Sequence, residues 1–356
     1  MFARIPNFVR TALLVLSLGL MAVAPAHAAA KKNFKIAWSI YVGWMPWDYA
    51  ASSGILKKWA DKYGIVIQLT QINDYVESIN QYTAGGFDGC VMTNMDMLTI
   101  PSAGGVDSTA LIIGDFSNGN DGVVLKGKGK TLANIKGLPV NLVELSVSHY
   151  LLARGLESVG LQERDIKVVN TSDADIVGAY AAADTKATVT WKPQLSEILA
   201  AKDAQLVFDS SKIPGEIIDL MVVNSATLKD NPQLGKALVG AWYETLKLMS
   251  AKDPKALAHM AKASGTDLAG FNSQLATTKM FWTPAEAHAF AVGPSVIKTM
   301  DLVRKFSFEH GLLGEGAKSA DAVGIEFPGG KTLGNPKSLK MRFDPSYTKM
   351  AMDGAL

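Results

Sequence analysis

The chain has 356 residues, of which 48% are hydrophobic and 19% are charged, and it carries 35 Lys and Arg against 33 Asp and Glu. This length suits two domains, and the near balance of charge excludes the concentrated basic surface of a nucleic-acid-binding protein. The single cysteine, Cys90, excludes an internal disulfide, so we expect the fold to depend on its core, with Cys90 as a small buried residue.

The first 28 residues have the pattern of an export signal. Arg4 and Arg10 make the start positive, and residues 11–24 are apolar and uncharged. Ala26-His27-Ala28, with a small residue on each side of His27, is typical of a cleavage site. We predict cleavage after Ala28, with Ala30 as the alternative. The apolar segment is shorter than the roughly 20 residues of a membrane span. The mature chain is therefore expected to be exported and soluble, with 33 basic and 33 acidic residues once the two arginines are removed.

Strand and helix patterns alternate in the first part of the mature chain. Predicted strands cover residues 34–40, 65–71, 89–92 and 109–114. Predicted helices cover residues 48–63, 75–84 and 94–103. Alternating strands and helices with short connections favour a mostly parallel sheet with helices on both faces.

A second series of the same kind follows the turn-rich segment 115–122. Its predicted strands cover 122–125, 138–142, 165–169, 187–190, 205–208 and 217–224, and its predicted helices cover 147–159, 173–182 and 192–201. Five helices are then predicted at 231–251, 253–264, 267–276, 284–291 and 292–311. Two of them begin with a capping residue followed by proline. From Gly314 the chain is rich in Gly, Lys and Pro, and we predict no regular element there.

These elements predict an α/β fold with two lobes. After the signal at 1–28, lobe 1 comprises 33–118 and 222–356, and lobe 2 comprises 119–221. The chain crosses between the lobes twice, so we expect hinges near 115–122 and 219–224. The cleft between two such lobes is the natural place for a ligand.

One loop concentrates aromatic residues. Residues 38–47 contain three of the seven tryptophans and cover the end of the first predicted strand and the loop after it. Ligands bind at the carboxyl ends of strands in open α/β sheets. We therefore predict that Tyr41, Trp44 and Trp47 form an aromatic box, which suits flat or cationic ligands. The alternative is that these rings pack into the core beneath the loop.

Several motifs together resemble one family. They are Lys136-Gly137 before a strand, Ser148-His149-Tyr150-Leu151 at the start of a helix, and Trp191-Lys192-Pro193 after a strand. With the two-lobe pattern they resemble the periplasmic substrate-binding proteins of ABC importers of the nitrate/sulfonate/taurine (NitT/TauT) type. Segments 38–47 and 141–150 are similar to the branch encoded near urea carboxylase genes, which implies urea or guanidine as ligand. One departure is Ala187-Thr188, where the family has Asp-Ala.

The resemblance implies a fold, a kind of ligand, a partner and a location for the protein. It implies the two-lobe periplasmic-binding-protein fold (type II), with mostly parallel sheets flanked by helices and the ligand in the cleft. It also implies a small-molecule ligand, a permease partner in the inner membrane, a periplasmic location, a monomer, and no cofactor or metal. We expect no catalytic residue and no nucleic-acid partner.

The charge of the ligand is judged from the loop before the helix at 147. Sulfonate and nitrate binders of this family usually carry Gly, Ser or Thr there, and the helix start favours an anion. This chain has Ser146 but also Glu144, whose carboxylate would repel a sulfonate and pair with a guanidinium. The alternative is that Glu144 only caps the helix near Ser146.

Further candidates lie at strand ends and in the crossover. Asp74, Thr93, Asn94 and Asp121 occupy such positions, although Asp74 and Asp96 are equally suited to cap the following helices. Trp191 is carried over from the family's Trp-x-Pro loop, with packing inside lobe 2 as the alternative. The predicted ligand-binding residues are Tyr41, Trp44, Trp47, Asp74, Thr93, Asn94, Asp121, Glu144, Ser146 and Trp191.

Three other function classes compete with a guanidine- or urea-binding transport protein. The first is a binding protein for a sulfonate- or nitrate-type anion. The second is an enzyme like the pyrimidine synthase of thiamin biosynthesis, but that enzyme carries a cysteine-rich motif and this chain has one cysteine. The third, an extracytoplasmic sensor, would need an anchor or an output module. The five histidines lack metal-ligand spacing, and His149 is interpreted as a helix residue.

Overall fold

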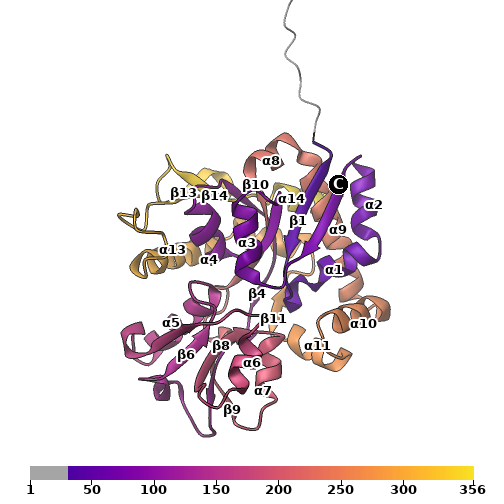
Figure 1. Ribbon diagram of the computed structural model, residues 1–356. Helices are drawn as coiled ribbons and strands as arrows, with labels where there is room; N and C mark the ends of the chain where they lie inside the picture. Colours follow the sequence, from indigo (N-terminus) through magenta and orange to yellow (C-terminus); the bar gives the residue numbers. More distant parts are fainter. Residues whose placement is uncertain (1–30) are drawn as a thin grey trace, which may run out of the picture. The chain divides into compact units, whose positions relative to one another are not determined.

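The computed structural model describes residues 31–356, so the predicted signal and both cleavage positions lie outside the described residues. The chain forms two sheets, which are drawn one above the other in Figure 1. We call the larger sheet with its helices the large lobe, and the smaller sheet with its helices the small lobe. The large lobe contains β1 (Asn33–Trp38), β2 (Val66–Gln71), β3 (Gly89–Thr93), β4 (Ser108–Ser117), β10 (Ile218–Asn224), β11 (Thr278–Met280), β12 (Gly324–Phe327), β13 (Lys331–Leu333) and β14 (Leu339–Phe343). The small lobe contains β5 (Asp121–Lys126), β6 (Pro139–Leu142), β7 (Lys167–Asn170), β8 (Ala187–Trp191) and β9 (Ala204–Asp209).

Both sheets are mixed, which refines the predicted α/β fold class. The strand order is β13-β12-β14-β4-β10-β3-β1-β2 in the large lobe, with β11 beside β4, and β7-β6-β8-β5-β9 in the small lobe. β10 runs antiparallel to β3 and β4, and β5 runs antiparallel to β8 and β9. These two strands enter their sheets from the other lobe, at the edge where the neighbouring parallel strands end. The prediction of mostly parallel sheets is therefore corrected at β5 and β10.

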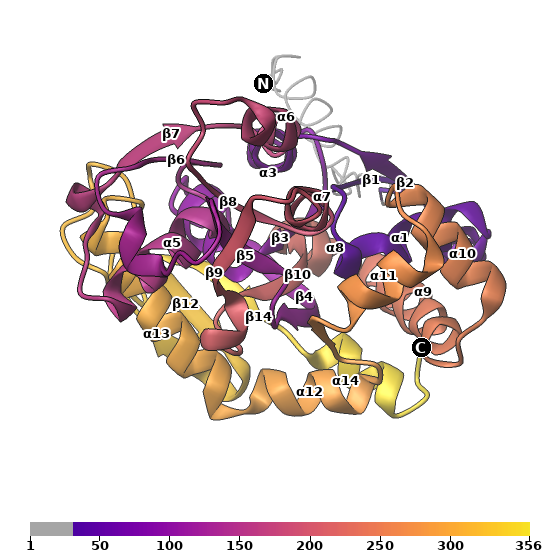
Figure 2. The same cartoon turned by 90° about the horizontal axis from the view of Figure 1, so that it is seen from below.

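Helices cover the sheets largely where the sequence predicts them. The helices are α1 (Met45–Ser52), α2 (Ile55–Lys62), α3 (Tyr75–Thr83), α4 (Asn94–Met97), α5 (Val147–Ser158), α6 (Ile176–Ala181), α7 (Gln194–Leu199), α8 (Ser225–Asp230), α9 (Pro232–Ser250), α10 (Pro254–Ala263), α11 (Leu268–Leu275), α12 (Pro284–Val292), α13 (Pro294–Glu309) and α14 (Ser346–Met352). Figure 2 shows α12 and α13 following one another along one edge of the molecule.

Two predicted helices are interrupted for local reasons. The helix predicted at 48–63 breaks into α1 and α2 at Gly54, whose backbone is left-handed with φ of 83°. The helix predicted at 94–103 is α4 followed by a π-helical turn, Leu98–Ser102. Pro101 lies inside that turn and cannot donate a backbone hydrogen bond, which accounts for the irregular geometry.

The segment after Gly314 is more regular than predicted. It forms β12, β13, β14 and α14, and β14 pairs in parallel with β4. These strands contain only three to five residues, too few to show a period of two clearly. Met341 and Phe343 of β14 nevertheless point into the core, with exposed fractions of 0% and 4%.

Two short segments carry the chain between the lobes. β4 runs on to Ser117 and β5 begins at Asp121, so the first crossing is only residues 118–120. The second crossing is residues 210–217, whereas the predicted hinge at 219–224 lies inside β10 in the middle of the sheet. Ser210 ties the crossings together, because its hydroxyl accepts a hydrogen bond from the Gly119 N–H (2.7 Å) and lies 2.6 Å from the Ser117 hydroxyl.

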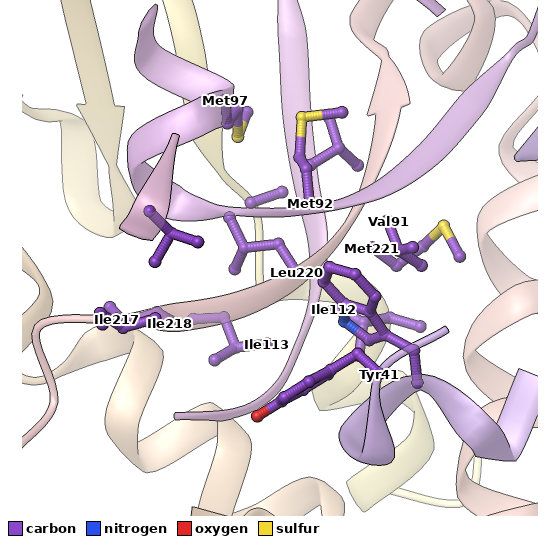
Figure 3. Packing of buried hydrophobic residues seen from close by; sticks show 14 of the residues in the cluster. Tyr41, Val91, Met92, Met97, Ile112, Ile113, Ile217, Ile218, Leu220 and Met221 are labelled. Atoms are coloured by element: carbon purple, nitrogen blue, oxygen red, sulfur yellow. The ribbon is translucent and has the colours of Figure 1, made fainter. Parts of the chain in front are cut away.

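The core of the large lobe forms around its central strands. Figure 3 shows aliphatic side chains of β3, β4 and β10 packed together, with the ring of Tyr41 beside them. Cys90 on β3 is fully buried, as predicted, and its sulfur lies 3.5 Å from the Ser78 hydroxyl. Among residues 31–356, none of the helices has the length and apolarity needed to span a bilayer.

Candidate functional site

A cavity lies where the two lobes meet. It is lined by Tyr41, Trp44, Tyr75, Thr93, Ile217 and Asp219 from the large-lobe side and by Asp121, Val147 and Trp191 from the small lobe. Its volume is about 270 Å³. This is slightly below the roughly 300–1,000 Å³ of ordinary small-molecule sites, so the cavity suits a small ligand.

Four aromatic rings form a continuous wall of this cavity. Tyr41 meets Trp44 edge-on with ring centroids 5.1 Å apart, and Trp44 lies 5.7 Å from Tyr75. Tyr75 in turn meets Trp191 of the small lobe edge-on at 5.5 Å. Tyr41 directly precedes the 3₁₀ turn Val42–Trp44, and Trp44 is the last residue of that turn. Gly43 is needed there, because a Cβ at this position would lie 2.4 Å from an Asp115 oxygen.

Three buried carboxyl groups lie at the cavity. Asp121 and Asp219 line it, and Asp115 lies behind the loop of Tyr41, whose hydroxyl donates a 3.0 Å hydrogen bond to Asp115 Oδ1. Their exposed fractions are only 3%, 3% and 0% respectively. The Ser117 hydroxyl donates to Asp121 Oδ2 at 2.5 Å, whereas Asp115 Oδ2 and Asp219 Oδ2 have no hydrogen-bond partner.

Burial dominates the acidity of these groups. Desolvation raises the pKa of Asp121 to about 7, against the Ser117 hydrogen bond. It also raises the pKa of Asp115 to about 7, although the neighbouring Asp219 and Tyr41 side chains oppose the change. The pKa of Asp219 is also raised well above its usual value, by burial and then by the charges of Asp115 and Asp121. Among the described residues that line the cavity there is no Lys, Arg or His to balance them.

A fourth carboxylate, that of Asp96 on α4, lies against the first residue of helix α5. Its Oδ2 accepts hydrogen bonds from the Tyr75 hydroxyl (2.6 Å) and the Thr93 hydroxyl (2.8 Å). Burial raises the pKa of Asp96 to about 6, and Tyr75, Thr93 and the backbone of Val147 oppose this rise. Val147 is the first residue of α5, so a carboxylate of the protein already lies where the helix start would attract an anion.

The structure brings half of the predicted site residues to the cavity. These are Tyr41, Trp44, Thr93, Asp121 and Trp191. They come from the loop after β1, from the last residues of β3 and β8, and from the first residue of β5. All of these positions are strand ends that face the other lobe, which is the reasoning on which the prediction depended.

The other five predicted residues lie elsewhere. Trp47 packs in the core against Trp242 at 5.1 Å, so it is not part of the aromatic wall. Asp74 caps α3 by accepting from the Glu77 N–H, and Ser146 caps α5 by accepting from the Ser148 N–H. The Asn94 amide accepts from the Ile218 N–H and donates to the Glu216 carbonyl. Glu144 is exposed and does not line the cavity. The carboxylates that do line it are Asp121, which the sequence analysis named as a candidate, and Asp219, which it did not consider.

Sequence reasoning missed four lining residues, Tyr75, Val147, Ile217 and Asp219. Asp219 had a usable signal, since it interrupts the apolar run Ile217–Val223 of a buried strand. Asp115 at the end of the apolar part of β4 shows the same signal. A carboxylate inside a buried strand is costly unless something compensates for it.

Other chemistry receives little support within residues 31–356. No group of three or more His, Cys, Asp and Glu side chains in this part of the chain is arranged to hold a metal ion. Ser52, His259 and Asp48 do meet, but the Ser52 hydroxyl (3.1 Å) and an Asp48 oxygen (2.6 Å) both contact His259 Nε2. A catalytic triad needs these partners on different ring nitrogens.

This fold, with two α/β lobes around a central cavity, is that of the periplasmic binding proteins. The sequence model of the NMT1-like family matches residues 37–264, more than half of the chain, and the chain therefore belongs to the NMT1-like family. Among curated proteins, it is similar to the taurine-binding periplasmic protein of Escherichia coli (strain K12), with 22% identity over 176 residues. That match covers 45% of this chain and about half (53%) of the relative's length.

Solved structures support the same fold. The alkanesulfonate-binding protein SsuA from Xanthomonas axonopodis pv. citri, bound to MOPS, has a TM-score of 0.68 at 18% identity and covers 83% of this chain and 99% of its own. The nitrate-binding protein NrtA from Synechocystis PCC 6803 has a TM-score of 0.56 at 13% identity and covers 92% and 99%. At these identities the likeness concerns the fold alone.

Proposed function

We propose that the protein is the solute-binding component of an ABC importer, which captures a small planar nitrogen compound such as guanidine or urea and delivers it to a permease. Membership of the NMT1-like family and the fold of named binding proteins support the coarser part of this proposal. The same relatives support a periplasmic location, a permease partner and the absence of catalysis. We further propose a monomer, in which the small lobe begins near residue 119 as predicted and ends before β10, a few residues earlier than predicted.

The names of the relatives favour a different ligand. They are binding proteins for taurine, alkanesulfonates and nitrate, which supports the alternative of a sulfonate- or nitrate-type ligand better than guanidine or urea. Taurine is the strongest form of this second candidate, because it carries an ammonium group that would pair with a cavity carboxylate. Its sulfonate would need donors, and the buried Nε1 of the lining residue Trp44 has no partner.

One observation on this chain carries the guanidine-type proposal. Asp121 and Asp219 face the cavity with no basic side chain among the described lining residues. A simple anion about 4 Å from an ionised carboxylate is disfavoured by roughly 4 kcal/mol at an effective dielectric constant of about 20. A guanidinium is favoured by the same electrostatics and offers N–H donors to carboxylate oxygens. Urea offers similar donors without the charge.

The shape of the cavity supports the same ligand class. The aromatic wall of Tyr41, Trp44, Tyr75 and Trp191 suits a flat group, and a cation over an indole face gains about 0.5–2 kcal/mol. The cavity volume of about 270 Å³ accommodates a ligand of this size. The walls come from both lobes, so ligand and closure should be coupled through the crossings at 118–120 and 210–217.

The test is a calorimetric titration of the purified protein with guanidinium chloride, urea, taurine and sodium nitrate at millimolar concentration and constant ionic strength. Intrinsic tryptophan fluorescence gives a second readout, since Trp44 and Trp191 line the cavity. We expect guanidinium or urea to bind and nitrate not to bind. Tight binding of taurine or nitrate, with none of guanidinium or urea, would establish the second candidate instead.

A further inference from the structure

The side chains of Asp115, Asp121 and Asp219 lie close together around one cavity. Asp219 on β10 lies directly opposite Asp115 on β4 in the antiparallel register. Side chains opposite each other in such a pair lie on the same face of the sheet, with Cβ atoms about 4.5–5.5 Å apart. Asp121 follows the three-residue crossing from β4 and lies on the small-lobe side of the same cavity.

The charged and titratable groups around this cluster do not neutralise it. The Tyr41 hydroxyl donates to Asp115, and Asp96 on α4 adds a further negative charge near Asp121. Tyr75 uses its hydroxyl on Asp96. The nearby Lys192 ammonium donates instead to the Thr277 hydroxyl at 2.9 Å.

Glu216, on the second crossing, is likewise held away from the cluster. Its carboxylate accepts hydrogen bonds from Arg154 Nε (2.9 Å) and from the Tyr150 hydroxyl (2.6 Å). The cluster therefore has three carboxyl groups, two oxygens without partners, and no cation from these neighbours.

We propose that Asp115 and Asp219 hold a proton between them in the ligand-free protein, and that a cationic ligand displaces this proton on binding. The inference rests on the proposed function. Two carboxyl groups side by side in a buried site do not both ionise, and they titrate as a pair. Burial raises the pKa of both Asp115 and Asp219 above the usual range, which is consistent with this arrangement. On binding, the proton leaves the carboxyl oxygen for the buffer and the ligand's positive charge takes its place, so the net charge of the site is unchanged.

Proton displacement predicts opposite pH dependences for different probes. Guanidinium should bind more weakly as the pH falls, by up to tenfold per pH unit for one displaced proton, wherever the ligand-free pair holds that proton. Urea is neutral and displaces no proton, so its affinity should vary little over the same range. An anion would show the reverse of guanidinium, since it would bind with uptake of a proton.

The experiment is calorimetry of guanidinium chloride binding to the purified protein near pH 7, in buffers of low and high ionisation enthalpy at equal ionic strength. The dependence of the observed heat on the buffer measures the protons released. We expect release of between about half and one proton, and binding about tenfold weaker at pH 6 than at pH 7. In Asp115→Asn the pair is broken, so release should fall towards zero while some binding remains.

A matched control removes a carboxyl group outside the cavity. Asp74→Asn keeps an N-cap on α3, because Asn caps as well as Asp, and proton release should equal that of the parent. If guanidinium binds with equal heat in both buffers and equal affinity at both pH values, proton displacement is wrong although the proposed function stands. If guanidinium and urea fail to bind at any pH while taurine binds, the proposed function fails and this inference fails with it.

Discussion

Two groups of carboxylates in the same molecule differ in whether a basic side chain lies beside them. At the edge where the small lobe meets α13, Glu163 lies 2.9 Å from His149 Nε2 and 3.0 Å from His310 Nδ1. Burial alone would raise the pKa of Glu163, but the two histidines lower it to about 2. At the cavity, Asp115 and Asp121 have no such partners and their pKa values rise to about 7.

The comparison shows that this fold can supply cations for half-buried acids where they serve structure. Glu216 is held by Arg154, and Glu163 joins the small lobe to the residue after α13 in the large lobe. The cavity acids lack this compensation, which is unfavourable for stability unless a ligand provides it. Sites of function are where such a local conflict is expected.

The largest effect is expected from removing a cavity charge. Asp219→Asn keeps the size of the side chain and removes its charge, so affinity for guanidinium should fall about a hundredfold or more, the usual loss when one partner of a desolvated charge pair is removed. The free energy of unfolding should not fall, because the carboxylate has no cationic partner in the ligand-free protein. Calorimetry and thermal melting of the variant, beside Asp74→Asn, measure both quantities. Equal losses of affinity in the two variants would contradict the assignment.

The paired acids should respond in the opposite manner. Arg154→Met leaves Glu216 without its cation, so we expect the free energy of unfolding to fall by about 2 kcal/mol, less than for a fully buried pair. Ligand affinity should stay within twofold. Lys57→Met is the control, because the Lys57–Asp61 pair is exposed and should contribute less than about 0.5 kcal/mol. Denaturant unfolding of both variants measures the difference, and an Arg154→Met variant as stable as the parent would refute the structural role.

The aromatic wall should contribute less than the cavity acids. Trp191→Ala removes the small-lobe ring that meets Tyr75, and affinity should fall about tenfold, or 1.4 kcal/mol. Trp59→Ala is a matched control, since that indole donates to Glu244 outside the cavity. Ligand titration with a melting curve separates the two roles. Normal binding by folded Trp191→Ala would make this ring a packing residue, as the alternative reading of the sequence had it.

The two groups also predict how stability varies with pH. Asp115 and Asp121 have pKa values near 7 when folded but about 3.9 when unfolded, so the folded state binds more protons between these limits and stability falls as the pH rises through them. The pKa of His310 is raised, mainly by its hydrogen bond to Glu163, so its stabilisation is also lost as the pH rises above its folded pKa. Glu163 loses its contribution only below 4.5, towards about 2.

Between about pH 5 and pH 7.5 these effects have the same sign. The melting temperature of the ligand-free protein should therefore be a few degrees higher at the lower pH. Asp115→Asn should reduce the difference. Scanning calorimetry across this range is the measurement, and a melting temperature that rises with pH would contradict the raised pKa values of the cluster.

The smallest effect is expected at Glu144. Its side chain is exposed and outside the cavity lining, so Glu144→Gln should change guanidinium affinity less than twofold. The sequence analysis instead predicted that this carboxylate would pair with a guanidinium ligand. A titration that gave Glu144→Gln the same loss as Asp219→Asn would restore the original assignment and place the ligand nearer the α5 loop.

Local sequence patterns were sufficient for most elements and for part of the site. Strand ends and turn residues identified the loops of Tyr41, Trp44 and Trp191, because a loop after a parallel strand always faces the same edge of the sheet. The patterns failed where a few residues decide the structure. Gly54 divides a helix, and the short strands after Gly314 have too few residues to show their period.

What the sequence determined by itself was the α/β class, the two series of elements and the aromatic loop. Only the tertiary structure decided which acids meet. Asp219 reaches the cavity because β10 inserts between β3 and β4, opposite Asp115, and that pairing joins residues more than a hundred positions apart. Trp47 turns from the cavity to Trp242 for the same reason, since the partner that buries it comes from α9. Local pattern reports which face of an element is apolar, whereas the partner of that face is chosen by packing across the whole chain.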